Sequence, residues 1–140
     1  MAKVTQPARP SLLLEEIVGV GFAVGEITGW LAASAEARAA FRVRVVNMAL
    51  TPRPFWHKKQ FRKLEADLFE IKWKAENCEW RALGFDYEGR FVMVLGCVHK
   101  GGVYEPPNWK KTAQGRITEV KNGKWKRIPF EHIQPKDASK

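Results

Sequence analysis

The sequence predicts an α+β domain, and three observations on its 140 residues support that prediction. Residues 26–50 have helical periodicity, residues 68–98 have the pattern of three consecutive strands, and residues 107–120 are helical again. Strands and helices that follow one another in blocks, without βαβ alternation, are typical of this fold class. We therefore expect an N-terminal strand and a helical hairpin, then a three-stranded antiparallel meander and a C-terminal helix.

The first 24 residues are expected to form a tail and one strand. Met1–Pro10 holds two prolines and little apolar content, which predicts a flexible tail. Ser11–Val24 is apolar and rich in β-branched residues, as in a strand, although its glycines weaken the pattern. The apolar run Ile17–Val24 is too short to span a bilayer, and no secretory signal is visible. We therefore expect a cytoplasmic protein without membrane contact.

A helical hairpin is expected in residues 26–50, with Ser34 as the N-cap of its second helix. The buried face of that helix is marked by apolar residues at i, i+4 and i+7, which are Phe41, Val45 and Met48. The basic segment His57–Leu64 then reads as a connection that leads into the sheet.

Three antiparallel strands are expected in Leu68–Ala75, Trp80–Tyr87 and Phe91–Val98. The first alternates between cationic and apolar side chains, which is typical of a half-buried strand. The third is apolar on both faces and should be the central one. The loop Glu76–Glu79 and the two-residue turn Glu88-Gly89 are expected to join the three strands.

One face of this meander is predicted to carry four cations, which are Lys72, Lys74, Arg81 and Lys100. A hairpin closed by the four-residue loop would pair Lys74 with Arg81, and the next turn would place Arg81 beside Gly96. Like charges directly opposite each other destabilise a sheet, and burying them unpaired costs several kcal/mol. With no acid on this face other than Glu70, we expect either solvent or a bound anion to neutralise the pair.

The C-terminal helix is expected to begin at Pro107, because proline favours the first helical position. Helical spacing places four apolar residues on one face of this helix, which are Trp109, Ala113, Ile117 and Val120. Asn122-Gly123 then predicts the helix end. The folded domain is accordingly expected at residues 11–123. The basic extension 124–140 is either an additional contact surface or a strand or arm packed on the sheet.

The charge distribution indicates a polyanionic partner. The net charge is +9. Residues 1–51 carry five Lys and Arg against four Asp and Glu, whereas residues 52–140 carry 19 against 11, so the excess lies with the predicted sheet. Such asymmetry is typical of a nucleic-acid-binding surface. The alternative is a generic basic protein.

Cysteine, histidine and tyrosine residues in and around the strands are the candidates for metal binding or catalysis. Cys78 and Cys97 lack metal-ligand spacing, so we expect no metal and no cofactor, and Cys97 is expected to fill core space. His99 is a candidate for proton transfer near neutral pH, and Tyr104 is a candidate phenol or stacking group. A structural or surface role is the alternative for both.

Taken in order, these segments resemble the RelE/HigB superfamily of bacterial toxins, especially its phage-derived HigB-like branch. That branch has a K-L-x-x-x-L-x-E-[IL]-[RK] strand, a [YW]-R strand, an apolar strand that ends in a basic pair, and a closing helix. The matching residues here are Lys63-Leu64, Leu68, Glu70-Ile71-Lys72, Trp80-Arg81 and His99-Lys100. The resemblance covers about Val18–Gly123, and it implies a RelE-like fold.

The resemblance also implies a function. It suggests a metal-independent endoribonuclease that acts on messenger RNA, often on the ribosome, and is held inactive by an antitoxin, a small helix-turn-helix protein. In such enzymes the 2′-hydroxyl attacks the adjacent phosphate. The implied catalytic residues are Arg81, Lys74, His99, Lys100 and Tyr104, with Arg81 stabilising the pentavalent phosphate. The implied RNA-binding residues are Lys72, Lys110, Lys111, Lys124, Lys126 and Arg127.

An alternative function stays open, because relatives that poison DNA gyrase share the scaffold without nuclease activity. A basic nucleic-acid-binding module is a further alternative. Fold alone does not separate these functions, since the chemistry depends on the site.

Overall fold

The computed structural model describes residues 13–19, 25–57, 59–65, 67–100, 103–105 and 107–130, with the backbone alone at 100 and 103–105. The predicted tail 1–10, the Gly101-Gly102 pair and residues 131–140 lie outside the described residues. The helices and strands in chain order are β1 (Leu14–Val18), α1 (Glu26–Leu31), α2 (Ala35–Ala49), the 3-10 helix η1 (Arg53–Phe55), β2 (Phe61–Glu65), β3 (Leu68–Ala75), β4 (Cys78–Tyr87), β5 (Arg90–Lys100), β6 (Val103–Glu105), α3 (Trp109–Lys121) and β7 (Lys126–Pro129).

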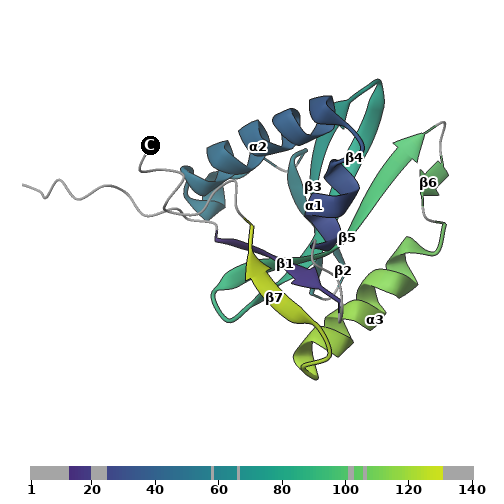
Figure 1. The fold of residues 1–140 in the computed structure, drawn as a ribbon. Coiled ribbons are helices and arrows are strands. Elements are labelled where there is room, and N and C mark those ends of the chain that lie inside the picture. The colour runs from purple at the N-terminus through teal and green to yellow at the C-terminus, as the bar shows by residue number, and fades with distance from the viewer. Residues whose placement is uncertain are drawn as a thin grey trace, which may run out of the picture.

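The described strands form one twisted sheet with helices on both faces (Figure 1). Six strands follow the order β2-β3-β4-β5-β1-β7, and the short β6 pairs with β5. All pairings are antiparallel except β1 with β5, which is parallel. The expected α+β class, helical hairpin, meander and C-terminal helix are therefore confirmed.

Apolar residues that helical periodicity predicted to face the core are buried in both long helices. Phe41, Val45 and Met48 of α2 are buried against Trp73 of β3 in a cluster on one side of the sheet. On the other side, three residues of α3 are buried with residues of β4 and β5, and these are Ala113, Ile117 and Val120. Each helix therefore stabilises the fold by removing one apolar stripe from water.

The start of α2 also fixes one end of the meander. The Ser34 hydroxyl caps α2 by accepting a hydrogen bond from the Ala37 N–H at 3.0 Å, as its sequence context predicts. The same hydroxyl donates to the Glu76 carboxylate at 2.7 Å, and the Glu76 N–H donates to Glu36 at 2.9 Å. The β3–β4 turn is thus held at the N-terminus of α2.

Two strands lie where the sequence predicted a connection or an extension. The segment His57–Leu64 was expected to be a basic connection, but Phe61–Glu65 forms the edge strand β2. Edge strands commonly carry exposed cations, and these made the segment resemble a linker. In the C-terminal extension, Lys126–Pro129 forms β7 and pairs with β1, so the alternative of a strand packed on the sheet is confirmed.

The predicted β3–β4 register was wrong by two residues. The strands are joined by the two-residue turn Glu76-Asn77, whose φ angles are 53° and 61°, and not by a four-residue loop. Positive φ at both central positions is the geometry of a type I′ hairpin turn, which Asn tolerates. As a result, Lys72 and not Lys74 lies opposite Arg81.

The β4–β5 register departs from expectation because of a β-bulge. The turn pair Tyr87–Arg90 forms as predicted, but the ladder shifts by one residue between Leu83 and Gly84. A Cβ on Gly84 would overlap the Val92 carbonyl oxygen, so the bulge depends on glycine at this close approach.

The bulge changes the neighbours of Arg81. Cys97, and not Gly96, lies opposite Arg81, so the predicted Arg81–Gly96 pairing was wrong. The same shift places the His99 side chain on the sheet face that was predicted for Lys100. Cys97 is fully buried in the cluster beneath α3, and burial raises the pKa of its thiol to about 12, so its predicted core-filling role is confirmed.

Gly96 has a packing role on the opposite face. A Cβ at this position would overlap the Trp30 indole of α1. We expect Gly96→Ala to lower the free energy of unfolding by about 1–3 kcal/mol, because the overlap forces the indole out of its site. Gly115→Ala is the matched control, since Gly115 is exposed on α3 and a Cβ there meets nothing within 4 Å. This substitution should stabilise the protein by about 1 kcal/mol, because alanine favours the helix more than glycine does. Urea denaturation of both variants tests this, and equal effects would contradict it.

Candidate functional site

The hairpin registers gather titratable side chains into two neighbouring rows on one sheet face. The first row runs across β3, β4 and β5 as Lys74, Glu79 and His99, and it continues to the backbone of Tyr104 in β6. The second row is Lys72, Arg81 and Cys97. Since Cys97 packs beneath α3, both rows face the α3 side of the sheet. We call Lys72, Lys74, Glu79, Arg81 and His99 the sheet-face cluster.

Arg81 lies at the buried base of the sheet-face cluster. Its side chain is 6% exposed and binds two carboxylates, Glu70 at 3.0 Å through Nη1 and Glu79 at 2.6 Å through Nη2. Glu70 is 1% exposed and also pairs with Arg62 Nε at 2.6 Å. The strands thus form a chain of alternating charges, Arg62–Glu70–Arg81–Glu79, which neutralises Arg81 internally.

The premise that Glu70 is the only acid available to this face was therefore wrong. Glu79 belongs to β4 and faces the same side as Arg81, because the turn before it is two residues long. An Asn-containing two-residue turn is the sequence signal that would have revealed it. The like-charge pair that seemed to require an anion is replaced by Lys72 opposite an Arg81 that already has carboxylate partners.

His99 lies next to Glu79, at one end of the chain of alternating charges. Its side chain is 28% exposed, and Nδ1 is 3.6 Å from Glu79 Oε1. The Arg81 hydrogen bond, opposed by burial but aided by the positive charge of Lys72, lowers the pKa of Glu79 below its ordinary value. Glu79 therefore stays ionised at neutral pH, and its carboxylate lies close enough to Nδ1 to orient the imidazole.

The other predicted residues are distributed differently. For Lys100 and Tyr104 the backbone alone is described, and Tyr104 is paired with His99. Lys110 and Lys111 are exposed at the start of α3, where Lys110 pairs with Glu65 at 3.5 Å. Lys124 and Lys126 are exposed near β7, and Arg127 pairs with Glu15 and Glu88. Because β7 is at the opposite edge of the sheet from β2, the last three residues are not brought to the sheet-face cluster.

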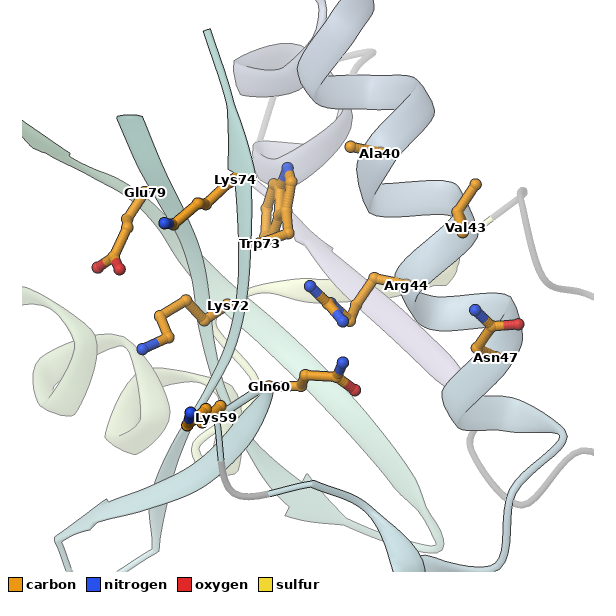
Figure 2. Close-up of a pocket in the computed structure, with 10 residues that line it drawn as sticks. All are labelled: Ala40, Val43, Arg44, Asn47, Lys59, Gln60, Lys72, Trp73, Lys74 and Glu79. Atoms are coloured by element: carbon orange, nitrogen blue, oxygen red, sulfur yellow. The ribbon is translucent and has the colours of Figure 1, made fainter. Parts of the chain in front are cut away.

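A groove that the sequence did not predict adjoins the sheet-face cluster. The β2–β3 pairing ends at Phe61 and Ile71, followed by a hydrogen bond of 2.9 Å from the Lys72 N–H to the Gln60 carbonyl. Among the described residues, no strand covers this side of β3 after Lys72. A groove of about 670 Å³ surrounds this open edge and is lined by residues of α2, β3 and the segment before β2, and by Glu79 of β4 (Figure 2). We call it the edge groove.

The edge groove is rich in cations from distant parts of the chain. Arg44 points from α2 toward β3, while Lys72 and Lys74 extend from the other side of the strand (Figure 2). Lys59 completes the lining from below the strand edge (Figure 2). Arg44 and Lys59 were missed as candidates, because the packing of α2 on β3 brings Arg44 to this edge and the β2–β3 pairing brings Lys59.

In the described part of the chain, no three His, Cys, Asp or Glu residues are grouped to hold a metal ion. None of the helices in these segments is both long and apolar enough to cross a bilayer.

Comparison with known proteins identifies the family. Searches of curated proteins and of solved structures gave no significant match. A family model described as "Phage derived protein Gp49-like (DUF891)" matches residues 29–120, which run from α1 to α3 and include the whole sheet-face cluster. This match covers well over half of the sequence. The chain therefore belongs to the Gp49-like family of phage-derived proteins.

Proposed function

We propose that this protein is the toxin of a type II toxin–antitoxin pair and cleaves messenger RNA without a metal ion, in a ribosome-dependent manner. The observation that carries the proposal is the sheet-face cluster, in which His99 lies beside ionised Glu79 and in the row of Lys74. A half-exposed imidazole with an orienting carboxylate and neighbouring cations suits proton transfer next to a phosphate.

The proposed reaction uses a nucleophile that RNA itself supplies. His99 Nε2 takes the proton of a 2′-hydroxyl, whose oxygen attacks the adjacent phosphorus. The bond from phosphorus to the 5′-oxygen breaks, and that oxygen receives a proton from Lys100, Tyr104 or water. The products are a 2′,3′-cyclic phosphate and a 5′-hydroxyl end. No metal-activated water is required, because the attacking oxygen belongs to the substrate.

The cations of the cluster have separate roles in this proposal. Lys72 is half-buried and Lys74 is exposed, and neither has an ion pair among the described side chains, so both are available to a phosphate. Fixed positive charge of this kind stabilises the extra negative charge of the pentavalent phosphate. Arg81 acts as a positioning residue, since it holds Glu79 and is itself buried between carboxylates.

Family membership and net charge support the proposed partners. Phage-derived Gp49-like proteins fit the resemblance to the HigB-like branch, in which a small helix-turn-helix antitoxin inhibits the toxin. A net charge of +9 suits messenger RNA and ribosomal RNA as polyanionic partners. These partners require the protein to act in the cytoplasm.

Primer-extension mapping of cellular transcripts after brief induction tests this function. We expect new 5′ ends within coding regions in cells that express the wild-type protein, and 2′,3′-cyclic phosphate on the upstream fragments. Intact transcripts together with altered DNA supercoiling would contradict the nuclease and favour a gyrase poison. Intact transcripts with normal supercoiling and growth would favour a nucleic-acid-binding module.

A further inference from the structure

The edge groove contains an arginine, Arg44, that makes no ion pair with any described residue. Arg44 Nε is buried and has no hydrogen-bond partner in the described part of the protein, and burial lowers the pKa of the guanidinium. Arg44 as a whole is half-buried, and burying its Nε without a partner costs free energy that an anion bound at the guanidinium would offset in part. Lys59, Lys72 and Lys74 around the same groove likewise make no ion pair with described residues, so the groove has a local excess of positive charge.

A second hollow continues the edge groove along β2. Its volume is about 570 Å³, and it shares Lys59 and Lys72 with the edge groove, so the two form one path. Two further cations of β2, Arg62 and Lys63, line it. The combined path therefore runs from α2, around the open edge of β3, to the outer strand of the sheet.

A planar cation is held rigidly in this second hollow. The Arg53 guanidinium binds Asp86 through both terminal nitrogens, at 3.1 and 2.9 Å. It lies 4.9 Å from the ring centres of Trp56 and Phe61. The side chain is nevertheless 43% exposed, so the guanidinium plane is fixed by its neighbours and still accessible. Guanidinium planes of this kind stack with unpaired nucleic-acid bases.

We propose that the edge groove and the second hollow bind a single RNA strand, with phosphates at Arg44 and Lys59 and a base stacked on Arg53. This inference rests on the proposed function, since it describes the path by which substrate RNA leaves the sheet-face cluster. Lys72 belongs to both sites and connects them. Four cations of the path, Arg44, Lys59, Lys72 and Lys74, make no ion pair with described residues, whereas Arg62 and Arg53 bind carboxylates. A groove with positive charge beside a stacking platform is the arrangement by which proteins bind single strands. An acidic protein segment could use the cations but would gain nothing from the planar platform.

The first experiment measures binding of an RNA of about 12 nucleotides, a length within the usual site sizes of single-strand binders. The probe is 2′-O-methylated, so that it lacks the attacking hydroxyl and stays intact. We expect Arg44→Ala to weaken its binding about tenfold, as for loss of one charge-assisted hydrogen bond. The slope of log K against log salt should fall in magnitude by about 0.7, the value for one phosphate contact on a single strand.

Arg42→Ala is the matched control. Arg42 is exposed on the same helix and does not line the groove, and two residues turn a helix by about 200°, to its far side. The control removes the same net charge from the same element and should change the affinity less than about twofold. Equal losses for Arg42→Ala and Arg44→Ala, or no loss for either, would overturn the proposed path.

A second variant separates stacking from charge. Arg53→Lys keeps the positive charge and removes the plane. We expect about a fivefold loss of affinity, the lower end for one stacked base, with an unchanged salt slope. Unchanged affinity would overturn the stacking platform.

Failure of the path and failure of the proposed function have different signatures. If the path is wrong, His99-dependent cleavage of ordinary RNA persists while Arg44→Ala binds and cleaves like wild type. If the nuclease function is wrong, ordinary RNA stays intact, even though binding of the methylated probe depends on Arg44 and Arg53.

Discussion

Replacing His99 with alanine is expected to slow RNA cleavage by at least about 100-fold, the lower end of what a positioned general base contributes. The imidazole is proposed to take the 2′-hydroxyl proton, and alanine offers no group that could replace it. The fold should survive, because the side chain is 28% exposed and the neighbouring Glu79 keeps its bond to Arg81. Cleavage rates of ordinary RNA in a translation extract, together with the thermal unfolding midpoint, measure both effects.

His57→Ala is the control for that experiment. His57 is exposed, and its Nδ1 accepts a hydrogen bond from the Lys59 N–H at 3.1 Å, outside the sheet-face cluster. Its loss should leave the cleavage rate within about twofold of wild type, since it lies away from the proposed reacting atoms. Full activity of His99→Ala would show that the general base lies elsewhere, and Tyr104→Phe would then be the next variant to compare.

The second large effect is expected on stability. Arg81→Met should lower the free energy of unfolding by about 3 kcal/mol, because it leaves the buried Glu70 carboxylate without one of its two cations. The loss falls at the lower end of the usual range for a broken buried pair, since Arg62 still contacts Glu70 at 2.6 Å. Urea denaturation monitored by tryptophan fluorescence measures it.

Two further variants test the cause of that loss. Arg62→Met removes the half-exposed cation, whose side chain is 50% accessible, and should cost only about 1 kcal/mol. The double variant Arg81→Met with Glu70→Leu should recover most of the stability, because an apolar pair of similar size tolerates burial. A single Arg81→Met as stable as wild type would contradict the buried ion-pair network.

The expected loss of stability affects the interpretation of any inactive Arg81 variant. The resemblance to RelE/HigB toxins assigns Arg81 directly to the phosphate, but its side chain is enclosed between Glu70 and Glu79. Loss of toxicity in an Arg81 variant is therefore expected from destabilisation and from a misplaced Glu79, without any contact to RNA. Stability has to be measured beside activity at this position.

The helices were predictable because their signals are local. The N-cap at Ser34 and the apolar spacing of Phe41 and Val45 lie within single turns of one helix. The helix stop at Asn122-Gly123 is equally local, with Gly123 at a φ of 79° after α3. The edge strand β2 was missed, since an exposed basic strand and a basic linker share one composition.

Alternation within a strand predicted which side chains share a face, but not how the faces of different strands combine. The alternation in β3 placed Lys72 and Lys74 on one face, and Arg81 stayed on that face because the register error was an even number of residues. The bulge at Leu83–Gly84 shifted the β4–β5 register by one residue, so His99 and Lys100 exchanged the sheet faces that were expected for them. Close approach of two backbones determines such a bulge, and no pattern within one strand reveals it.

By itself, then, the sequence determined the class of fold, the helices, the core meander and the basic character of the sheet. Only the tertiary structure decided that Glu70 and Glu79 neutralise Arg81, that His99 lies beside Glu79, and that Arg44 and Lys59 line one groove at an open edge. The physical reason is the range of the interactions. Helical periodicity and capping act within a few residues, whereas ion pairs between strands and grooves between a helix and a sheet depend on register and packing of distant segments.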